Sequence, residues 1–361
     1  MKNKFIGTIL ILLAFHNLGL TQLHAIDSPV KNFEKLWEVF NNRYANFELK
    51  QVDWQEIYEK YRVEVNRETT NIELFKISCA MLQELKDGHV TIEPNFKEDD
   101  EIECGPPYEF SLVVAFKTED EQRKFSAVMD HELMQNGFSK PMKEDLTEDT
   151  NYQYRSSDSY GYLRLDEMTE KITFGKFKRT VDKSMAAFQS KKGLILDLRF
   201  NGGGWDHHAY VLVSRLIPKG ETVAHYEHTR IKGENDYTAL KRKTVKSAGK
   251  NQFTKPIVIL TSDFTASATE VFLLLMRELP HVTIIGDDTE GIFSDMYFFK
   301  LPNKWKISLS HQQFFSKDME NFEGTGIPPD IRMLNSTMDI ETQSDPVIKT
   351  AMDYLERETN K

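Results

Sequence analysis

The sequence has few cysteines and none of the cysteine pairs that organise zinc sites. Its 361 residues include two cysteines, Cys79 and Cys104, without CxxC spacing. Neither a zinc knuckle nor a disulfide-rich scaffold is therefore indicated. Two interpretations of the pair stay open. Export from the cytoplasm would permit a single Cys79–Cys104 bridge, and a buried thiol at Cys79 on a helix face with an unrelated Cys104 fits equally well.

Long hydrophobic runs are also absent. No apolar run approaches the roughly 20 residues that a membrane-spanning helix needs. The apolar run at residues 5–15 follows Lys2 and Lys4 and leads to Ala25, which is the layout of a secretory signal peptide with a small residue at the cleavage point. We therefore expect residues 1–25 to be removed on export to the periplasm or the cell exterior, with no stable membrane span in the mature chain.

The chain lacks an excess of positive charge. Its 46 Lys and Arg residues are outnumbered by 56 Asp and Glu residues, which gives a formal net charge of −10. A chain this acidic is a poor candidate for binding phosphate backbones by charge. Nucleic acid is therefore not expected as a partner.

Hydrophobic periodicity divides the rest of the chain. Residues 26–95 are expected to form an N-terminal helical subdomain, because apolar positions recur at helical spacing as far as the helix-stop signal Lys86-Asp87-Gly88. Residues 96–155 are rich in charge and carry two short strand candidates, Phe110 to Phe116 and Phe125 to Met129. We interpret this range as a variable middle region.

From Gly161 the pattern changes to alternating strands and helices. Apolar, β-branched runs that alternate with helical segments indicate an α/β sheet covered on both faces, and we expect this core over residues 156–335. Ser344-Asp345-Pro346 marks the start of a C-terminal helix within residues 336–361. The expected strands are 161–165, 193–199, 257–261 and 282–286, the expected helices lie at about 173–189, from about 206, and at 266–279, and a hairpin pairs 297–301 with 306–309.

Ser267 is the first candidate for chemistry. It lies between an expected buried strand and an expected amphipathic helix, where backbone N–H groups and the positive end of the helix dipole converge. A serine hydroxyl there can attack a carbonyl group whose oxygen the amide of Ala268 would stabilise. The alternative is a helix N-cap, the common role of a serine at a helix start.

A glycine run is the second candidate. Gly202, Gly203 and Gly204 follow the strand expected at 193–199, and open α/β sheets place their ligands at such carboxyl ends. Three glycines let the backbone turn sharply and expose its amides, which would supply a second donor to an oxyanion. The spacing matches neither GxGxxG nor GxxxxGK[ST], so a nucleotide loop has little support. An ordinary tight strand-to-helix turn is the alternative.

The order of four motifs resembles the superfamily of tail-specific, or carboxy-terminal processing, proteases. The similarity spans about residues 160–335, and the helical segment that ends at His89 extends it toward the N-terminus. The resemblance implies a ClpP/crotonase-like α/β core, serine peptidase activity and no cofactor. The motifs are Asp197-Leu-Arg-Phe-Asn-Gly-Gly-Gly, Ser267-Ala-Thr-Glu, Gly286-Asp-Asp-Thr-Glu-Gly and Glu323-Gly-Thr-Gly-Ile-Pro-Pro-Asp.

The superfamily has two catalytic arrangements, and the resemblance favours one of them. Tail-specific members pair the serine with a lysine, and this chain has Ile292 at the matching place. Members that resemble the tricorn core use a histidine from the N-terminal helical subdomain and a glutamate from the late loop, which match His89 and Glu323. Tricorn carries a serine directly before that histidine, whereas this chain has Gly88, so part of the polar support for the imidazole is missing.

By this resemblance, Ser267 is the nucleophile, His89 is the general base and Glu323 orients the base. The amides of Gly204 and Ala268 would donate to the oxyanion. An imidazole suits the role of base because its pKa lies near neutral pH, and triads are recognised by geometry rather than by chain order. For His89 the alternative is a histidine that satisfies a turn, and for Glu323 it is a solvated loop carboxylate.

The other histidines give two further hypotheses. His207 and His208 follow the glycine run, but adjacent side chains diverge and no HExxH-like spacing completes a metal site. No metal is therefore expected. His311 is the reserve candidate for the base.

The expected function is hydrolysis of exported or extracellular peptides and proteins through a serine acyl-enzyme. Two alternatives stay open. Gly88 and Ile292 keep a non-catalytic ligand- or peptide-binding module in view, and an esterase would use the same oxyanion hole. A PDZ domain accompanies many tail-specific members, but its carboxylate-binding loop is not recognisable in residues 96–155, where a diverged or absent PDZ domain is expected.

Overall fold

The computed structural model describes most of the chain after the predicted signal peptide. The described residues are 28–96, 104, 110–112, 116, 118–143, 152–168 and 173–361. The predicted signal peptide, residues 1–25, lies outside them. Within the part of the chain that is described, no helix combines the length and the apolar character needed to cross a bilayer.

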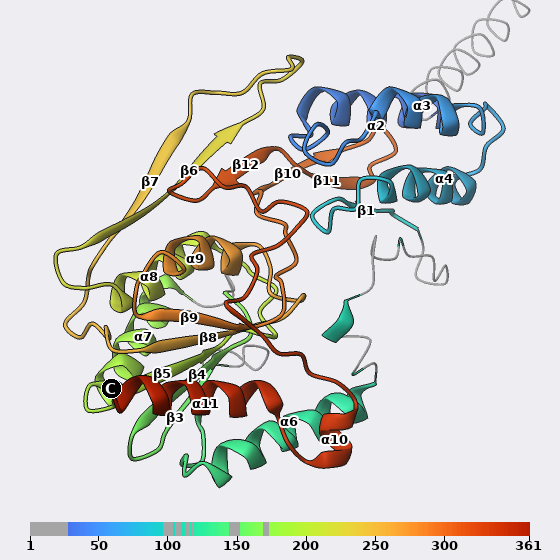
Figure 1. The fold of residues 1–361 in the computed structure, drawn as a ribbon. Coiled ribbons are helices and arrows are strands. Elements are labelled where there is room, and N and C mark those ends of the chain that lie inside the picture. The colour runs from blue at the N-terminus through green and yellow to red at the C-terminus, as the bar shows by residue number, and fades with distance from the viewer. Residues whose placement is uncertain are drawn as a thin grey trace, which may run out of the picture. The chain divides into compact units, whose positions relative to one another are not determined.

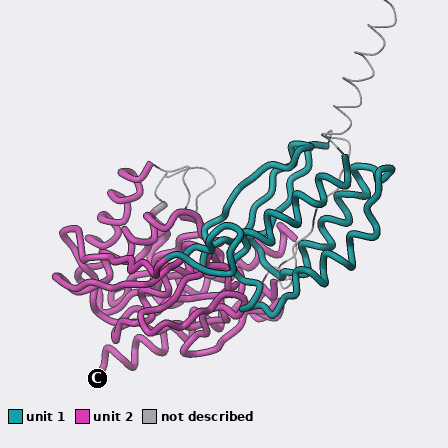
Figure 2. The backbone as a smooth tube through the Cα atoms, turned by 90° about the horizontal axis from the view of Figure 1, so that it is seen from above, with its two compact units in different colours: residues 1–107, 229–238, 295–312 teal, residues 108–228, 239–294, 313–361 magenta. Residues whose placement is uncertain are grey.

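Two units, each assembled from segments distant in sequence, make up the chain (Figure 2). Unit 1 contains residues 1–107, 229–238 and 295–312, and unit 2 contains residues 108–228, 239–294 and 313–361. The structure groups residues 295–312 with the N-terminal helices in unit 1. The domain bounds expected from the sequence stay predictions.

In its described residues, unit 1 contains three helices and a small antiparallel sheet. Local capping sets the helix starts: the Asp53 carboxylate accepts from two amides at the start of α3, and Thr70 and Glu73 form a capping box at the start of α4. Aromatic side chains such as Phe40, Trp54 and Trp305 are buried in its core. The helices are α2 (Pro29–Arg43), α3 (Trp54–Arg62) and α4 (Asn71–Gln83), and the sheet has the order β1 (Thr91–Glu93), β11 (Lys306–Ser310), β10 (Met296–Lys300).

Unit 2 contains a seven-stranded sheet in the order β13-β9-β8-β5-β4-β3-β2. Figure 1 labels its strands β9, β8, β5, β4 and β3. Its neighbours from β13 to β4 pair in parallel, whereas β3 and β2 are antiparallel additions at one edge. The strands are β2 (Met142–Lys143), β3 (Tyr152–Ser156), β4 (Tyr160–Leu165), β5 (Gly193–Asp197), β8 (Ile257–Thr261), β9 (Val282–Gly286) and β13 (Ile331–Arg332).

Helices cover both faces of this sheet. Leu194 and Leu196 of β5 pack in the cluster that contains α7, α8 and α9, whereas Ile195 between them packs in the cluster that contains α6 and α11. This alternation follows from the two-residue period of a strand, and it confirms the predicted two-sided α/β core. The helices are α6 (Glu119–Gln135), α7 (Phe174–Phe188), α8 (Asp206–Leu216), α9 (Ala268–Met276) and α11 (Pro346–Thr359).

The remaining elements are short or peripheral. A third sheet has the order β12-β6-β7, and a five-residue helix, α10, precedes α11. The bounds are β6 (Thr222–Thr229), β7 (Lys241–Lys246), β12 (Gln312–Phe315) and α10 (Met338–Thr342).

Most predicted elements of the core are confirmed, and the middle region is not. The segment Phe125 to Met129, expected as a strand, lies inside α6. Its apolar residues recur at helical spacing, and Thr118 and Glu121 form a capping box at the helix start, so local capping and the longer period both favour a helix. Ser111 and Leu112 are also helical, which contradicts the strand expected there, whereas residues 113–115 lie outside the described part.

Candidate active site

The glycine turn after β5 is fixed by buried hydrogen bonds. The Asn201 side chain accepts from the Gly203 amide at 3.0 Å and from the Thr269 hydroxyl at 2.7 Å, and it donates to the Leu165 carbonyl at 2.9 Å. Gly203 has a φ of 103°, a backbone conformation that favours glycine. The turn is therefore a rigid feature that ties β4, β5 and α9 together.

Gly204 lies in the turn at a position that has no room for a side chain. Its φ is 131°, and a Cβ there would lie 2.0 Å from the Met168 carbonyl oxygen. Met168 N–H donates to the Gly203 carbonyl at 2.7 Å, and Trp205 N–H donates to the Met168 carbonyl at 2.8 Å. These bonds leave the Gly204 N–H without an acceptor among the described residues.

Ser267 lies at the start of α9 in a strained conformation. Its φ of 56° and ψ of −123° are rare for a residue with a side chain, and such conformations cost of order 1–3 kcal/mol and cluster at functional sites. Ser267 occupies the N-cap position of α9, and the Glu270 carboxylate accepts from its N–H at 3.0 Å, as in a capping box. The Glu270 N–H also donates to the backbone carbonyl of Ser267, at 2.8 Å.

The glycine turn packs directly against Ser267. A Cβ on Gly203 would lie 2.6 Å from the Ser267 Cβ and 3.1 Å from the Ala268 nitrogen. Within the described residues, the Ala268 N–H has no intramolecular acceptor. The Gly203 amide is already bonded to Asn201, whereas the amides of Gly204 and Ala268 have no acceptor among the described residues.

Glu270 holds the loop that carries Ser267, and the sequence interpretation gave it no role. Its fully buried carboxylate accepts from the Ser267 N–H at 3.0 Å, from the Thr289 hydroxyl at 2.5 Å, and from two further amides at 2.7 and 2.8 Å, those of Gly291 and Ile292. Burial raises the pKa of Glu270 to about 7, and the four donors oppose that rise. A glutamate three residues after a helix-start serine is the capping-box spacing, and that signal could have identified it.

Glu323 is buried beside the same loop. It is 3% exposed, and its carboxylate accepts from the Phe293 N–H at 2.9 Å. Consecutive amides of Ile292 and Phe293 thus hold Glu270 and Glu323 respectively. The alternative of a solvated loop carboxylate is wrong, because Glu323 lies in the interior of unit 2.

Backbone bonds fasten the Glu323 loop to the loop after β9. Gly324 N–H donates to the Gly291 carbonyl at 2.7 Å, and Ile327 N–H donates to the Thr289 hydroxyl at 2.8 Å. Ile292 itself is 6% exposed, so the residue at the place of the lysine of the Ser–Lys arrangement is an apolar residue of the interior.

His89 lies in unit 1, in a tight turn after α4. The buried Asp87 carboxylate accepts from the Tyr44 hydroxyl at 2.8 Å, from the His89 N–H at 2.9 Å and from the Ser310 hydroxyl at 3.2 Å. The His89 carbonyl accepts from the Ser308 hydroxyl at 2.7 Å. The turn is therefore satisfied by Asp87, and the backbone of His89 is fixed within its own unit.

The predicted site residues are divided between the two units. Unit 2 brings Ser267, Gly204, Ala268 and Glu323 together on loops that are bonded to one another, and unit 1 carries His89. The reserve base His311 also lies in unit 1; its Nδ1 lies 2.9 Å from the Asp295 carbonyl oxygen, and burial lowers its pKa.

The cysteine and histidine pairs have different surroundings. Cys79 and Cys104 are free thiols, and a hydrogen bond between them, together with burial, raises the pKa of Cys79. His208 is buried against Phe177, and its ring centroid lies 4.4 Å from that of His207. Across the described ranges, no three His, Cys, Asp or Glu side chains are arranged to hold a metal ion.

Comparisons with known proteins agree with this architecture. Residues 159–333 match the model of peptidase family S41, and residues 29–83 match that of the tricorn protease C1 domain. A carboxy-terminal-processing protease of Bartonella bacilliformis is 29% identical over 201 residues, which cover 54% of this chain and 44% of the relative. The chain thus spans less than half the length of that curated relative.

Solved structures extend the similarity over nearly the whole chain. A candidate peptidase from Parabacteroides merdae is 27% identical with a TM-score of 0.72, and the match covers 91% of this chain and 97% of that one. Mature CPAF is 12% identical with a TM-score of 0.67, covering 92% and 96% respectively, which shows a shared fold. The glycine turn, the strained serine and the two matched family models together place this chain in the S41 superfamily of peptidases.

Proposed function

We propose that this protein is a serine peptidase that cleaves peptide bonds through an acyl-enzyme on Ser267. The observation that carries the proposal is the strained backbone of Ser267 against a glycine turn, next to the two amides of Gly204 and Ala268 that have no acceptor among the described residues. A carbonyl placed there would meet a nucleophile on one side and two donors for its developing negative charge on the other.

The roles of the other residues follow from the chemistry of acyl transfer. His89 takes the proton of the Ser267 hydroxyl during attack and returns it to the leaving amine. Glu323 orients the imidazole, directly or through a water molecule. Its burial supports this role, because a carboxylate out of bulk water interacts more strongly with an imidazolium than a solvated one does.

The substrates in this proposal are exported or extracellular peptides and proteins. The sequence of residues 1–25 supports export to the periplasm or the cell exterior. The match to carboxy-terminal-processing proteases supports peptide substrates, and no cofactor takes part in the mechanism.

Labelling with a fluorophosphonate probe tests the proposal. Wild-type protein should be labelled and should cleave a casein-derived peptide mixture, the Ser267→Ala variant should do neither, and the His89→Ala variant should be labelled at least about 100-fold more slowly, since general-base catalysis contributes about 10²–10⁴-fold. Ser190→Ala, at an exposed serine after α7, is the matched control and should behave as wild type.

Three results would count against the proposal or part of it. Labelling of wild type that persists in Ser267→Ala would place the nucleophile elsewhere. Folded wild type that is not labelled and cleaves no peptide would indicate a binding module. Labelling without peptide cleavage, combined with turnover of nitrophenyl esters, would indicate an esterase.

A further inference from the structure

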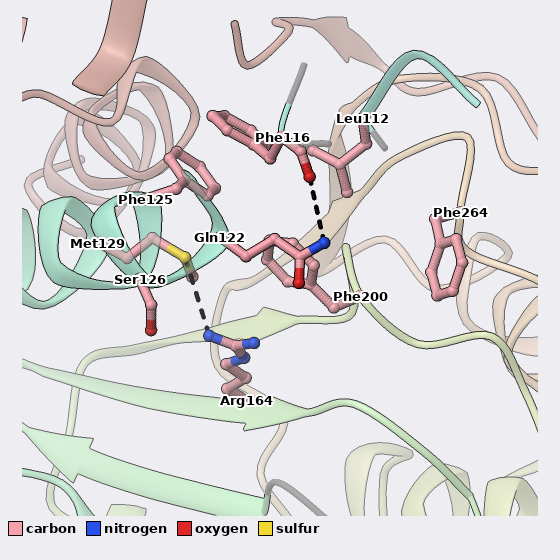
Figure 3. A pocket seen from close by; sticks show the side chains of 9 residues that line it. All are labelled: Leu112, Phe116, Gln122, Phe125, Ser126, Met129, Arg164, Phe200 and Phe264. Carbon is pink, nitrogen blue, oxygen red and sulfur yellow. Dashed lines mark hydrogen bonds between the residues drawn. The ribbon is translucent and has the colours of Figure 1, made fainter. Parts of the chain in front are cut away.

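An apolar cavity lies within unit 2, between α6 and the carboxyl ends of β4 and β5 (Figure 3). Its volume is about 300 Å³, and four phenylalanine rings contribute to its wall, those of Phe116, Phe125, Phe200 and Phe264. Ligand sites range from about 300 to 1,000 Å³. The cavity is therefore at the lower end of that range and suits a single large side chain.

Two of these rings belong to the loops of the candidate active site. Phe200 precedes Gly203 by three residues, and Phe264 precedes Ser267 by three residues. A Cβ on Gly202 would lie 3.5 Å from the Phe264 ring. Because three residues of extended chain span at most about 10 Å, the Cα atom of Phe264 lies within about 10 Å of the Cα atom of Ser267.

The outer wall of the cavity is bonded to the same loop. The Asp263 carboxylate accepts from the Ser111 N–H and, at 3.2 Å, from the N–H of Leu112, a residue that also lines the cavity. The Phe110 and Phe264 rings meet edge to face, with centroids 5.6 Å apart. The cavity and the Ser267 loop therefore form one connected structure within unit 2.

The polar groups of the cavity decide which occupant fits. Among the described residues that line it, Arg164 is the one that carries a charge, and Asp166 already holds that guanidinium by two hydrogen bonds of 2.7 and 2.8 Å. The guanidinium carbon lies 4.6 Å from the Phe200 ring centroid, and its remaining terminal nitrogen points at the Met129 sulfur, 3.9 Å away (Figure 3). Because the positive charge is balanced, the cavity favours an apolar occupant over an acidic one.

We propose that this cavity is a specificity subsite that receives one large apolar side chain, such as leucine or phenylalanine, from the peptide substrate. The subsite accepts a residue within about three positions of the scissile bond, because an extended peptide advances about 3.3 Å per residue. This inference rests on the proposed peptidase function and assigns its substrate preference.

Two tryptophan substitutions on α6 test the subsite. Ser126 lines the cavity and is exposed, so an indole there should fill the cavity mouth without disturbing the core. Ala127, the next residue, is also exposed but does not line the cavity. Ser126→Trp is therefore the test variant, and Ala127→Trp is its control.

The assay uses quenched peptides that differ at one position, which carries Leu, Phe, Ala or Asp. Wild type should cleave the Leu or Phe peptide with a kcat/KM at least about 10-fold above that for Ala or Asp at one position near the scissile bond, since removing buried methylenes costs 10-fold or more. Ser126→Trp should lose this preference and retain cleavage of the Ala peptide, whereas Ala127→Trp should keep it. Equal loss on all peptides, or a preference for Asp, would overturn the proposal.

A binding measurement separates this inference from the proposed catalysis. Fluorescein-labelled Leu and Ala peptides are titrated into Ser267→Ala protein, with and without Ser126→Trp, and the anisotropy is recorded. Stronger binding of the Leu peptide that Ser126→Trp abolishes supports the subsite even when wild type fails to react with fluorophosphonate. Labelling of Ser267 together with equal binding of the two peptides supports the peptidase and refutes the subsite.

Discussion

Replacing Gly203 by alanine should disable the site while leaving most of the fold intact. The added Cβ would lie 2.6 Å from the Ser267 Cβ and 2.8 Å from the Ala266 carbonyl oxygen, whereas carbon atoms in contact are separated by about 3.5–4.0 Å. Ser267 must therefore move by about 1 Å. Displacements of that size cost about 100-fold in rate, and alanine at a φ of 103° adds of order 1–3 kcal/mol of strain.

The adjacent glycine provides the control for this prediction. A Cβ on Gly202 would meet nothing closer than the Phe264 ring at 3.5 Å, and the residue is exposed. We expect Gly203→Ala to lower kcat/KM and the fluorophosphonate labelling rate by at least about 100-fold, with Gly202→Ala within a few-fold of wild type. Circular dichroism on both variants shows whether they fold. A folded Gly203→Ala variant that is labelled at the wild-type rate would refute the close packing of the turn against the nucleophile.

Two further substitutions test the residues that position the site. Glu270→Gln leaves at least one of four buried donors unpaired, so it should destabilise the fold by about 1–3 kcal/mol in chemical denaturation and slow labelling of Ser267. Burial raises the pKa of Glu270 to about 7 from its ordinary 4.5, so the folded state binds more protons than the unfolded state between these pH values. The stability advantage of wild type over Glu270→Gln should therefore shrink by about 3 kcal/mol as pH rises from 4.5 to 8. An advantage that does not depend on pH would refute the shift. Asp87→Asn weakens the acceptor for the Tyr44 hydroxyl and the His89 N–H, so it should lower both thermal stability and labelling rate, whereas Asp53→Asn keeps a good helix cap and should change neither.

The α/β core could be predicted because local signals and long-range packing agree there. The apolar runs at 193–199 and 257–261 are each followed by a helical segment, a pattern that predicts buried parallel strands. Both runs form such strands. The start of α11 could also be predicted from the sequence. The Asp345 side chain accepts from two amides of the first turn, and Pro346 occupies the first helical position.

The strand predicted in the middle region was wrong, and hydrophobic periodicity explains why. The run from Phe125 to Met129 is apolar at both strand-like and helix-like positions, and a window that short does not separate the two periods. What decides is the capping box at Thr118, whose side chain accepts from the Glu121 N–H at 3.2 Å. The capping-box residues are visible in the sequence, but they indicate a helix over Phe125 to Met129 only when that helix is as long as α6.

Within the site, the sequence interpretation identified residues by motif and did not identify the contacts that support them. Ser267 and the glycine turn were identified because their motifs resemble those of the tail-specific proteases. Glu270 was passed over because a glutamate in the first turn of a helix is common, and only the fold shows that its carboxylate also reaches the amides of Gly291 and Ile292. Donors that lie 21 and 22 residues away leave no local pattern.

The hydrogen bonds of the buried Glu270 carboxylate offset the backbone strain at Ser267. A non-glycine φ of 56° would relax if the loop were free, and the Glu270 carboxylate prevents this by accepting the Ser267 N–H while it is anchored by Thr289, Gly291 and Ile292. A hydrogen bond contributes about 0.5–1.5 kcal/mol, so two or three of the four offset the 1–3 kcal/mol of strain. The strained conformation of Ser267 is therefore maintained by an interior carboxylate, and weakening the contacts of that carboxylate should slow labelling of Ser267 before it unfolds the protein.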